Sequence, residues 1–172
     1  HSVEKYLARL VQQGYKVALC DQVEDPKQAK GLVRRAVTRV LTPGTVLEDS
    51  MLAAGQNNFL AAICVLNGRA GLATLDPSTG EFLVTELEGE QLQERLLQEL
   101  ARVRPSELLV PKGSEEIGTI ANAGLGVATT ESEAQDASRA ARSLLQQFDA
   151  TNLQGFGCED KPSAVVAASM IL

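Results

Sequence analysis

Hydrophobic and polar positions along residues 1–45 change from helical to extended spacing. Apolar residues that recur every three or four positions predict a helix that begins after Ser2 and ends at Gly14: Val3, Tyr6, Leu7, Leu10 and Val11. The segments 15–20 and 37–41 then alternate as short strands do. Asp25-Pro26 and Gly31 predict that the chain between these strands is a loop with at most one helical turn.

From Asn58 onward the spacing is typical of an antiparallel sheet. Three runs rich in strand-forming residues cover 59–66, 70–75 and 81–87. The first two are separated by Asn67-Gly68, the strongest two-residue hairpin signal, and the last two by the turn sequence of residues 76–80. The sequence therefore predicts a three-stranded antiparallel meander.

Helices and strands alternate after the meander. A helix over 89–104 is predicted from Leu92, Leu96, Leu100 and Val103, and Pro105 ends it. Short strands are predicted at 107–110 and 126–130, whereas the Gly-rich stretch 113–125 is ambiguous. Ser132 with Gln135 predicts a capping box for a further helix, and residues 164–172 are predicted to be helical with no stop signal, as in a fragment of a longer chain. The expected fold class is α/β, with a mixed sheet flanked by helices in the strand order of the ribonuclease H-like architecture.

Charge is distributed unevenly along the chain. Residues 1–45 contain eight Lys or Arg and four Asp or Glu, whereas residues 46–172 contain eight and eighteen. This reversal supports a domain boundary near Pro43, and an acidic second part is not expected to bind DNA by itself. The candidate contacts to a DNA backbone are the basic residues of the first part, with a solvated charged rim as the alternative: Lys27, Lys30, Arg34, Arg35 and Arg39. In a strand, Arg35, Val37 and Arg39 would share one face.

The residue types of a catalytic or metal site are not found at suitable spacings. Cys20, Cys64 and Cys158 lie far apart, and His1 is the only histidine. Scattered thiols suit a reducing cytoplasm, and no apolar run approaches the length of a membrane span. The first strand of the meander contains no carboxylate, although two-metal nucleases of this architecture need one there. Asp76 is explained by the turn that it opens.

Residues 14–45 contain many motif positions in one order, in the sequence GYKVALCDQVEDPKQAKGLVRRAVTRVLTPGT. This segment resembles the part of the bacterial MutS mismatch-repair family in which the mismatch-recognition domain ends and the connector domain begins. The segments NNFLAA (57–62), DPSTGEF (76–82), PSELL (105–109) and GFG (155–157) extend the resemblance. It implies three parts: the end of a partial α/β mismatch-recognition domain (1–44), a ribonuclease H-like connector domain (45–160), and the start of a helix leading to the core or lever domain (161–172).

The resemblance also implies a function. In the family, the full-length protein binds mismatched DNA as a homodimeric clamp that uses ATP and Mg²⁺, and the connector couples the mismatch-binding domain to the ATPase and offers a docking surface for MutL. Because the F-x-E and Walker motifs of the family do not occur in this sequence, we expect a non-catalytic, cytoplasmic fragment without a cofactor of its own or a membrane partner.

Two sets of residues are candidates for these roles. The candidate hinge consists of Thr42, Pro43, Gly44 and Thr45, and residues 153–160 are a second possible hinge. The candidate partner surface consists of Gln146, Gln147 and Phe156. The alternatives are a metal-dependent nuclease of ribonuclease H-like fold and a self-sufficient DNA-binding module.

Overall fold

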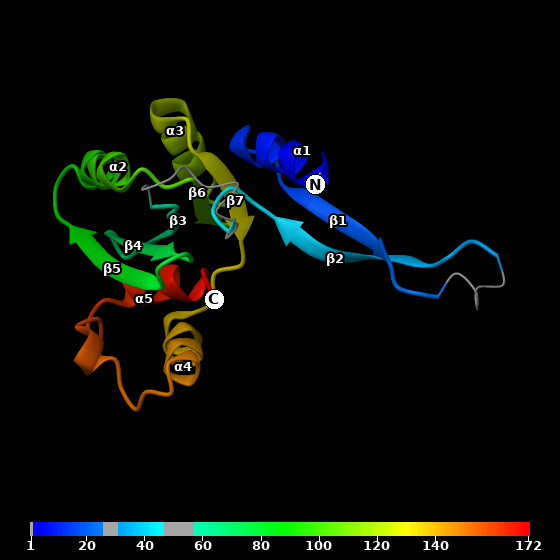
Figure 1. Ribbon diagram of the computed structural model, residues 1–172. Helices are drawn as coiled ribbons and strands as arrows, with labels where there is room; N and C mark the ends of the chain where they lie inside the picture. Colours follow the sequence, from blue (N-terminus) through cyan, green and yellow to red (C-terminus); the bar gives the residue numbers. More distant parts are fainter. Residues whose placement is uncertain (1, 26–30, 47–56) are drawn as a thin grey trace.

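The computed structural model describes residues 2–25, 31–46 and 57–172 (Figure 1). Two units follow each other along the chain. The N-terminal unit (residues 2–46) contains α1 (Ser2–Gln12) and the antiparallel strands β1 (Val17–Gln22) and β2 (Arg35–Leu41). The five-stranded unit (residues 57–172) contains a mixed sheet with helices on both faces.

The predicted first helix is confirmed, but only part of its predicted apolar face packs on the base of the two-stranded ribbon, because Val3, Tyr6 and Leu10 are exposed. Leu7 and Val11 are buried together with Leu41 and Val46. Gly14 ends the helix with a φ of 86°, a conformation that costs a glycine little. Beyond this small core the ribbon projects away from the rest of the molecule, and most of its residues are exposed (Figure 1).

A β-bulge changes the faces of the ribbon. Leu19 pairs with Arg39 whereas Cys20 pairs with Val37, so Thr38 is an extra residue in β2. The Thr38 hydroxyl donates a hydrogen bond to Asp21 Oδ2 at 2.6 Å. One inserted residue shifts the alternation of side chains by one position.

The prediction that Arg35, Val37 and Arg39 share one face is therefore wrong. Arg35 lies opposite Gln22, and Arg39 lies opposite Leu19. Leu19 and Gln22 are separated by an odd number of positions in β1, so they point to opposite faces.

The five-stranded unit contains the predicted meander and two parallel strands. The meander consists of β3 (Leu60–Leu66), β4 (Arg69–Asp76) and β5 (Glu81–Glu88), and the parallel strands are β6 (Glu107–Pro111) and β7 (Ala128–Ser132). The sheet order is β5-β4-β3-β6-β7, with β6 parallel to both β3 and β7. Positive φ values at Asn67 (50°) and Gly68 (74°) match the type I′ hairpin that this dipeptide favours.

Helices lie on both faces of the sheet (Figure 1). One face packs against α2 (Leu92–Val103) and α3 (Glu115–Leu125); the other packs against α5 (Pro162–Ser169), and α4 (Ala137–Gln147) packs on α5. Successive residues of β3 supply both cores: Ala61 and Ile63 belong to the first, and Ala62 and Cys64 to the second. Alternation along a strand buried on both faces produces this division.

Two helices differ from the sequence-based expectation. The ambiguous Gly-rich stretch forms α3, whose Ala121 is buried in the core that also contains residues of β3, β4 and β6. The predicted capping box at Ser132 and Gln135 is wrong. Ser132 ends β7, and the cap of α4 is Asp136, whose carboxylate accepts the Arg139 N–H at 3.0 Å.

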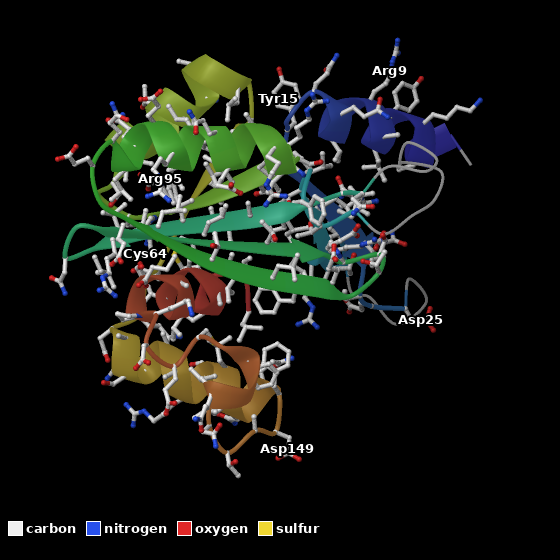
Figure 2. The ribbon with its side chains drawn as sticks, turned by 90° about the vertical axis from the view of Figure 1, so that its left-hand side faces the viewer. Arg9, Tyr15, Asp25, Cys64, Arg95 and Asp149 are labelled. Atoms are coloured by element: carbon white, nitrogen blue, oxygen red, sulfur yellow. The ribbon has the colours of Figure 1, made fainter. Side chains whose placement is uncertain are left out.

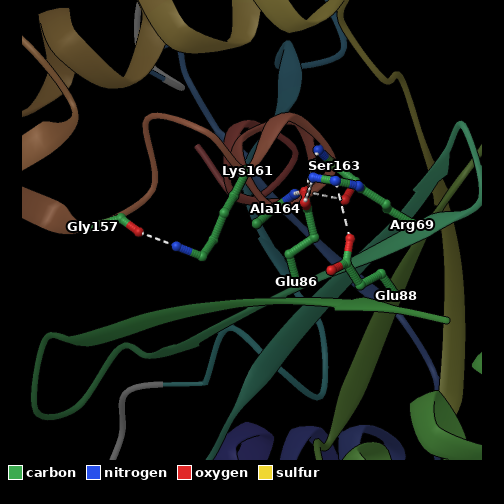
Figure 3. Close-up of polar contacts among 7 residues, drawn as sticks. All are labelled: Arg69, Glu86, Glu88, Gly157, Lys161, Ser163 and Ala164. Carbon is green, nitrogen blue, oxygen red and sulfur yellow. Dashed lines mark hydrogen bonds and ion pairs between the residues drawn. The ribbon is translucent and has the colours of Figure 1, made fainter.

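Helix α5 is buried from Ser163 to Ser169, between the sheet and α4. Its N-terminus crosses β4 at Gly71, where an added Cβ would lie 2.1 Å from the Ser163 carbonyl group. Glu86 of β5 accepts hydrogen bonds from the N–H and hydroxyl of Ser163 and from the Ala164 N–H, and it pairs with Arg69 at 3.1 Å (Figure 3). The carboxylate thus caps the helix where its dipole is positive.

These contacts place α5 inside the core of the five-stranded unit. The limits 1–44, 45–160 and 161–172 stay a prediction for the three parts of the chain. Among the described residues, no helix is both long enough and apolar enough to cross a membrane.

Candidate functional site

The four candidate hinge residues form a turn at the junction of the two units. Thr45 N–H donates to the Thr42 carbonyl at 3.1 Å, which closes a β-turn. The two hydroxyl groups lie 2.8 Å apart, and Thr45 Oγ1 also accepts the Thr42 N–H at 3.1 Å. The segment is therefore an ordered turn rather than an open linker.

A buried carboxylate joins this turn to the five-stranded sheet. Glu107, at the start of β6, is only 2% exposed. Its Oε2 accepts the Gly44 N–H at 3.1 Å, and its Oε1 accepts the Thr130 hydroxyl of β7 at 2.6 Å. Because each oxygen has its own donor, one side chain connects the turn to two neighbouring strands.

Asn58 makes a second connection between the same two elements. Its side-chain amide donates to the carbonyls of Pro43 at 3.0 Å and Val46 at 3.5 Å. Its Oδ1 accepts the Ser106 hydroxyl at 2.6 Å. The parallel pairing of Leu60 with Glu107 brings Asn58 and Glu107 to the same edge of the sheet.

Steric contact also restricts the turn. Gly44 is buried, and a Cβ at this position would lie 2.8 Å from Leu60 Cδ1 and 2.9 Å from Glu107 Cβ. Contacts below 3.0 Å are not tolerated without displacement of a neighbour. Only glycine therefore fits this position in the observed arrangement.

A cavity lined by residues of both units lies beside this contact. The cavity has a volume of about 680 Å³, and its lining includes Gly14 at the end of α1, Pro43 and Asn58 at the junction, and Asn122 and Ala128 on the side of α3 and β7. The end of α1 comes close to β7, since a Cβ at Gly14 would lie 3.7 Å from Ala128 Cβ, so residues of both units line the cavity. The role of the Thr42–Thr45 turn as a hinge stays a prediction.

The candidate DNA contacts lie on the ribbon, apart from this junction. Arg34, Arg35 and Arg39 are exposed, and Arg34 pairs through its backbone with Val23 and Glu24. Lys27 and Lys30 lie outside the described residues. Because of the bulge, Arg35 and Arg39 point from opposite faces of the ribbon, and their role as backbone contacts stays a prediction.

The candidate partner surface lies at the other end of the five-stranded unit. Gln146 and Gln147 are exposed at the end of α4, and Phe148 follows them directly. The ring of Phe156 lies 5.9 Å from that of Phe148, centroid to centroid. The structure thus brings Phe156 close to the end of α4, although the sequence offered no signal for the contact.

Asp76 is held by its own turn, as the sequence indicated. It is fully buried and accepts the N–H of Ser78 at 2.9 Å and the hydroxyl of Ser78 at 2.6 Å. Burial raises the pKa of Asp76, but these hydrogen bonds outweigh burial, and the pKa lies below its ordinary value. Among the described residues, no cluster of His, Cys, Asp and Glu is arranged to hold a metal ion.

Sequence reasoning missed the two side chains that hold the junction. Glu107 and Asn58 each stand next to an apolar strand, and in the sequence they look like ordinary strand boundaries. Only the parallel pairing of β3 with β6 places them beside Gly44. A polar residue that is 2% exposed needs hydrogen-bond partners. A sequence-based prediction that Glu107 is buried would therefore have identified it as a residue with a structural role.

Comparison with known proteins identifies both units. A family model described as MutS domain I matches residues 1–50, and one described as MutS domain II matches residues 58–172. The chain belongs to the MutS family. Its division into an N-terminal and a five-stranded unit agrees with the division between the two MutS models.

Relatives match along the whole chain. It is 44% identical to the DNA mismatch repair protein MutS of Symbiobacterium thermophilum and 45% identical to that of Desulfatibacillum aliphaticivorans. The protein of the same name from Halothermothrix orenii is 41% identical. Each alignment covers 100% of this chain, and the chain spans about a fifth of the length of these relatives.

Proposed function

We propose that this part of a MutS protein is a non-catalytic connector, which transmits movement of the N-terminal unit to the rest of a mismatch-repair ATPase. In this proposal the five-stranded unit has a ribonuclease H-like architecture. Its strand order, with a three-stranded meander followed by two parallel strands, supports that assignment.

The observation that carries the proposal is the attachment of the Thr42–Thr45 turn to the sheet through Glu107. A flexible linker would let the two units move independently. A turn that is hydrogen bonded to β6 and β7, with a cavity beside it, instead transfers a rotation of the ribbon to the strands. Coupling of this kind needs an element that is fixed at one point and free alongside it.

The coupling role is tested by a distance measurement across the junction in the 172-residue chain. One spin label is attached to Cys20, the exposed cysteine on β1, and the other to α2 through Gln98→Cys, while Cys64 and Cys158 are buried. Double electron–electron resonance is expected to give a narrow distribution of distances between the two labels when the junction is unaltered. Glu107→Leu is expected to broaden it, because the Gly44 N–H and the Thr130 hydroxyl lose their acceptor.

The matched control is Glu131→Leu, which removes an exposed carboxylate from the neighbouring strand β7. Asn58→Ala tests the second attachment and is expected to broaden the distribution to a smaller extent. A distribution in Glu107→Leu as narrow as in Glu131→Leu would contradict the coupling role. In the full-length protein, we expect Glu107→Leu to preserve mismatch binding but to reduce the effect of a mismatch on ATP turnover.

We further propose that the full-length protein, with ATP and Mg²⁺, acts in the cytoplasm as a homodimer on mismatched DNA and engages MutL through the five-stranded unit. The relatives are DNA mismatch repair proteins, which supports the repair role. The exposure of Gln146, Gln147 and Phe156 supports a protein-binding surface on this unit. Loss of MutL binding on substitution of these three residues in the full-length protein tests that assignment.

A further inference from the structure

We propose that the aromatic row of Phe82, Phe148 and Phe156, together with the acidic residues beside it, is a docking surface for a basic protein segment that carries an apolar anchor residue. The inference rests on the proposed partner-binding role of the five-stranded unit and adds the chemistry of the partner. It stands on different residues from the coupling role.

The row runs from the core to the surface. Phe82 of β5 packs against the core beneath α4 and α5. Phe148 lies 5.9 Å from Phe82 and is 44% exposed, and Phe156 lies 5.9 Å from Phe148 and is 56% exposed. Three of the four phenylalanines of the chain are thus in one row, and the outer two leave much of their ring surface in water.

The segment that presents Phe156 is ordered. Leu153 and Cys158 are buried on either side of it, and the Phe156 N–H donates to the Leu153 carbonyl at 3.1 Å. The Gly157 N–H donates to the Gln154 carbonyl at 2.9 Å. An aromatic side chain held in place before binding loses little conformational entropy, which is typical of the residues that dominate interfaces.

The charge beside the row selects the partner. Exposed acidic residues follow Phe148 and Phe156 in the sequence: Asp149, Glu159 and Asp160. Lys161 is the basic residue of the same segment, and it donates to the Gly157 carbonyl, so carboxylates outnumber cations there. In the parts of the chain that the structure describes, none of these three carboxylates has an ion-pair partner. The negative charge of these carboxylates repels the phosphates of a nucleic acid and a second copy of this acidic unit, so binding of either is disfavoured. A segment rich in Lys and Arg is attracted instead.

The surface is separate from the junction. Figure 2 shows Asp149 at the far end of the molecule from Arg9 and Tyr15, which belong to the N-terminal unit. A partner bound at the aromatic row therefore leaves the Thr42–Thr45 turn uncovered.

The experiment measures binding of fluorescein-labelled peptides to the 172-residue chain by fluorescence anisotropy. The probe is Gly-Lys-Arg-Trp-Lys-Arg-Gly, and its matched controls replace Trp by Gly or every Lys and Arg by Glu. We expect the probe to bind at least ten-fold more tightly than either control and to weaken as salt is raised. Phe156→Ala is expected to lower its affinity at least ten-fold. Leu83→Ala, a similarly exposed apolar residue on β5, is expected to have no effect.

A second variant guards against local distortion in Phe156→Ala. Asp149→Asn combined with Glu159→Gln keeps the aromatic row and is expected to remove most of the affinity and of its salt dependence. Equal binding of the three peptides, or an equal effect of Leu83→Ala and Phe156→Ala, would overturn the inference. The distance distribution across the junction is expected to be unchanged in Phe156→Ala, so failure here is distinguishable from failure of the coupling role.

Discussion

Substitution of Gly71 by alanine tests the close crossing of β4 and α5. The new Cβ would lie 2.1 Å from the backbone carbon and oxygen of Ser163 and 2.3 Å from the Ala164 nitrogen. Ordinary contact begins at 3.4 Å, so α5 has to move away by about 1.3 Å. The contacting atoms are backbone atoms of a buried helix, and they cannot yield as a flexible side chain would.

The cost has two parts. Overpacking of a filled core costs about 1–3 kcal/mol. The same displacement lengthens the bonds from Ser163 and Ala164 to the Glu86 carboxylate, and loss of one hydrogen bond to a charged group costs about 1.5–3 kcal/mol. We therefore expect Gly71→Ala to reduce the free energy of unfolding by about 3–5 kcal/mol, a large fraction of the stability of a typical domain.

Urea denaturation of the 172-residue chain, followed by circular dichroism, measures this loss. The matched control is Gly155→Ala, because a Cβ at Gly155 meets no atom within 4 Å and its φ is not positive. The free energy of unfolding of that variant is expected to lie within about 0.5 kcal/mol of that of the original chain. A loss below about 1 kcal/mol in Gly71→Ala would refute the reasoning, since it would mean that α5 moves without breaking its attachment to β5.

Three other predictions follow from the described contacts. Burial raises the pKa of Glu86, but hydrogen bonds from Ser163 and Ala164 outweigh burial and lower it, and the pKa of Asp76 is lowered in the same way. Both carboxylates therefore stabilise the folded state fully above their ordinary pKa values of 4.5 and 3.8, and this stability is lost as the pH falls through the lower pKa values of the folded state. Urea denaturation at pH values from 7 to 3 is expected to show a smaller decrease in the free energy of unfolding for Glu86→Gln than for the original chain. Leu100→Ala, at a fully buried position of α2, is expected to destabilise the chain by about 2–5 kcal/mol in the same denaturation assay, and a loss as small as that of an exposed residue would contradict the described core. In the full-length protein, Arg35→Ala is expected to weaken binding equally to matched and mismatched DNA and to reduce the slope of log affinity against log salt by about 1; an unchanged slope would assign Arg35 to a solvated rim.

Local pattern predicted most of the five-stranded unit. The meander followed from strand-forming runs separated by Asn67-Gly68, and the helical face of α2 followed from Leu96 and Leu100, because each signal lies within a few neighbouring residues. Helix α3 was ambiguous because its glycines lower helix propensity. The burial of its Ala121 in the core depends on the tertiary fold and leaves no local pattern.

The features that the sequence did not indicate depend on pairing between distant residues. The bulge at Thr38 is defined by the register of β1 against β2, so simple alternation assigned Arg39 to the wrong face. The attachment of Gly44 to Glu107 joins residues 63 positions apart. Residue types at these positions are compatible with several pairings, and only the completed sheet selects one.

The position of α5 in the chain has a consequence for folding during synthesis. Glu86 and Ser163, which meet at the start of this helix, are 77 residues apart. A ribosome therefore releases the whole meander well before the helix that covers one of its faces, and the apolar side chains of that face stay exposed to water and to other nascent chains in the interval. Helix α5 is thus made after the strands whose core it closes, and completion of the five-stranded unit is expected to be a late, cooperative event.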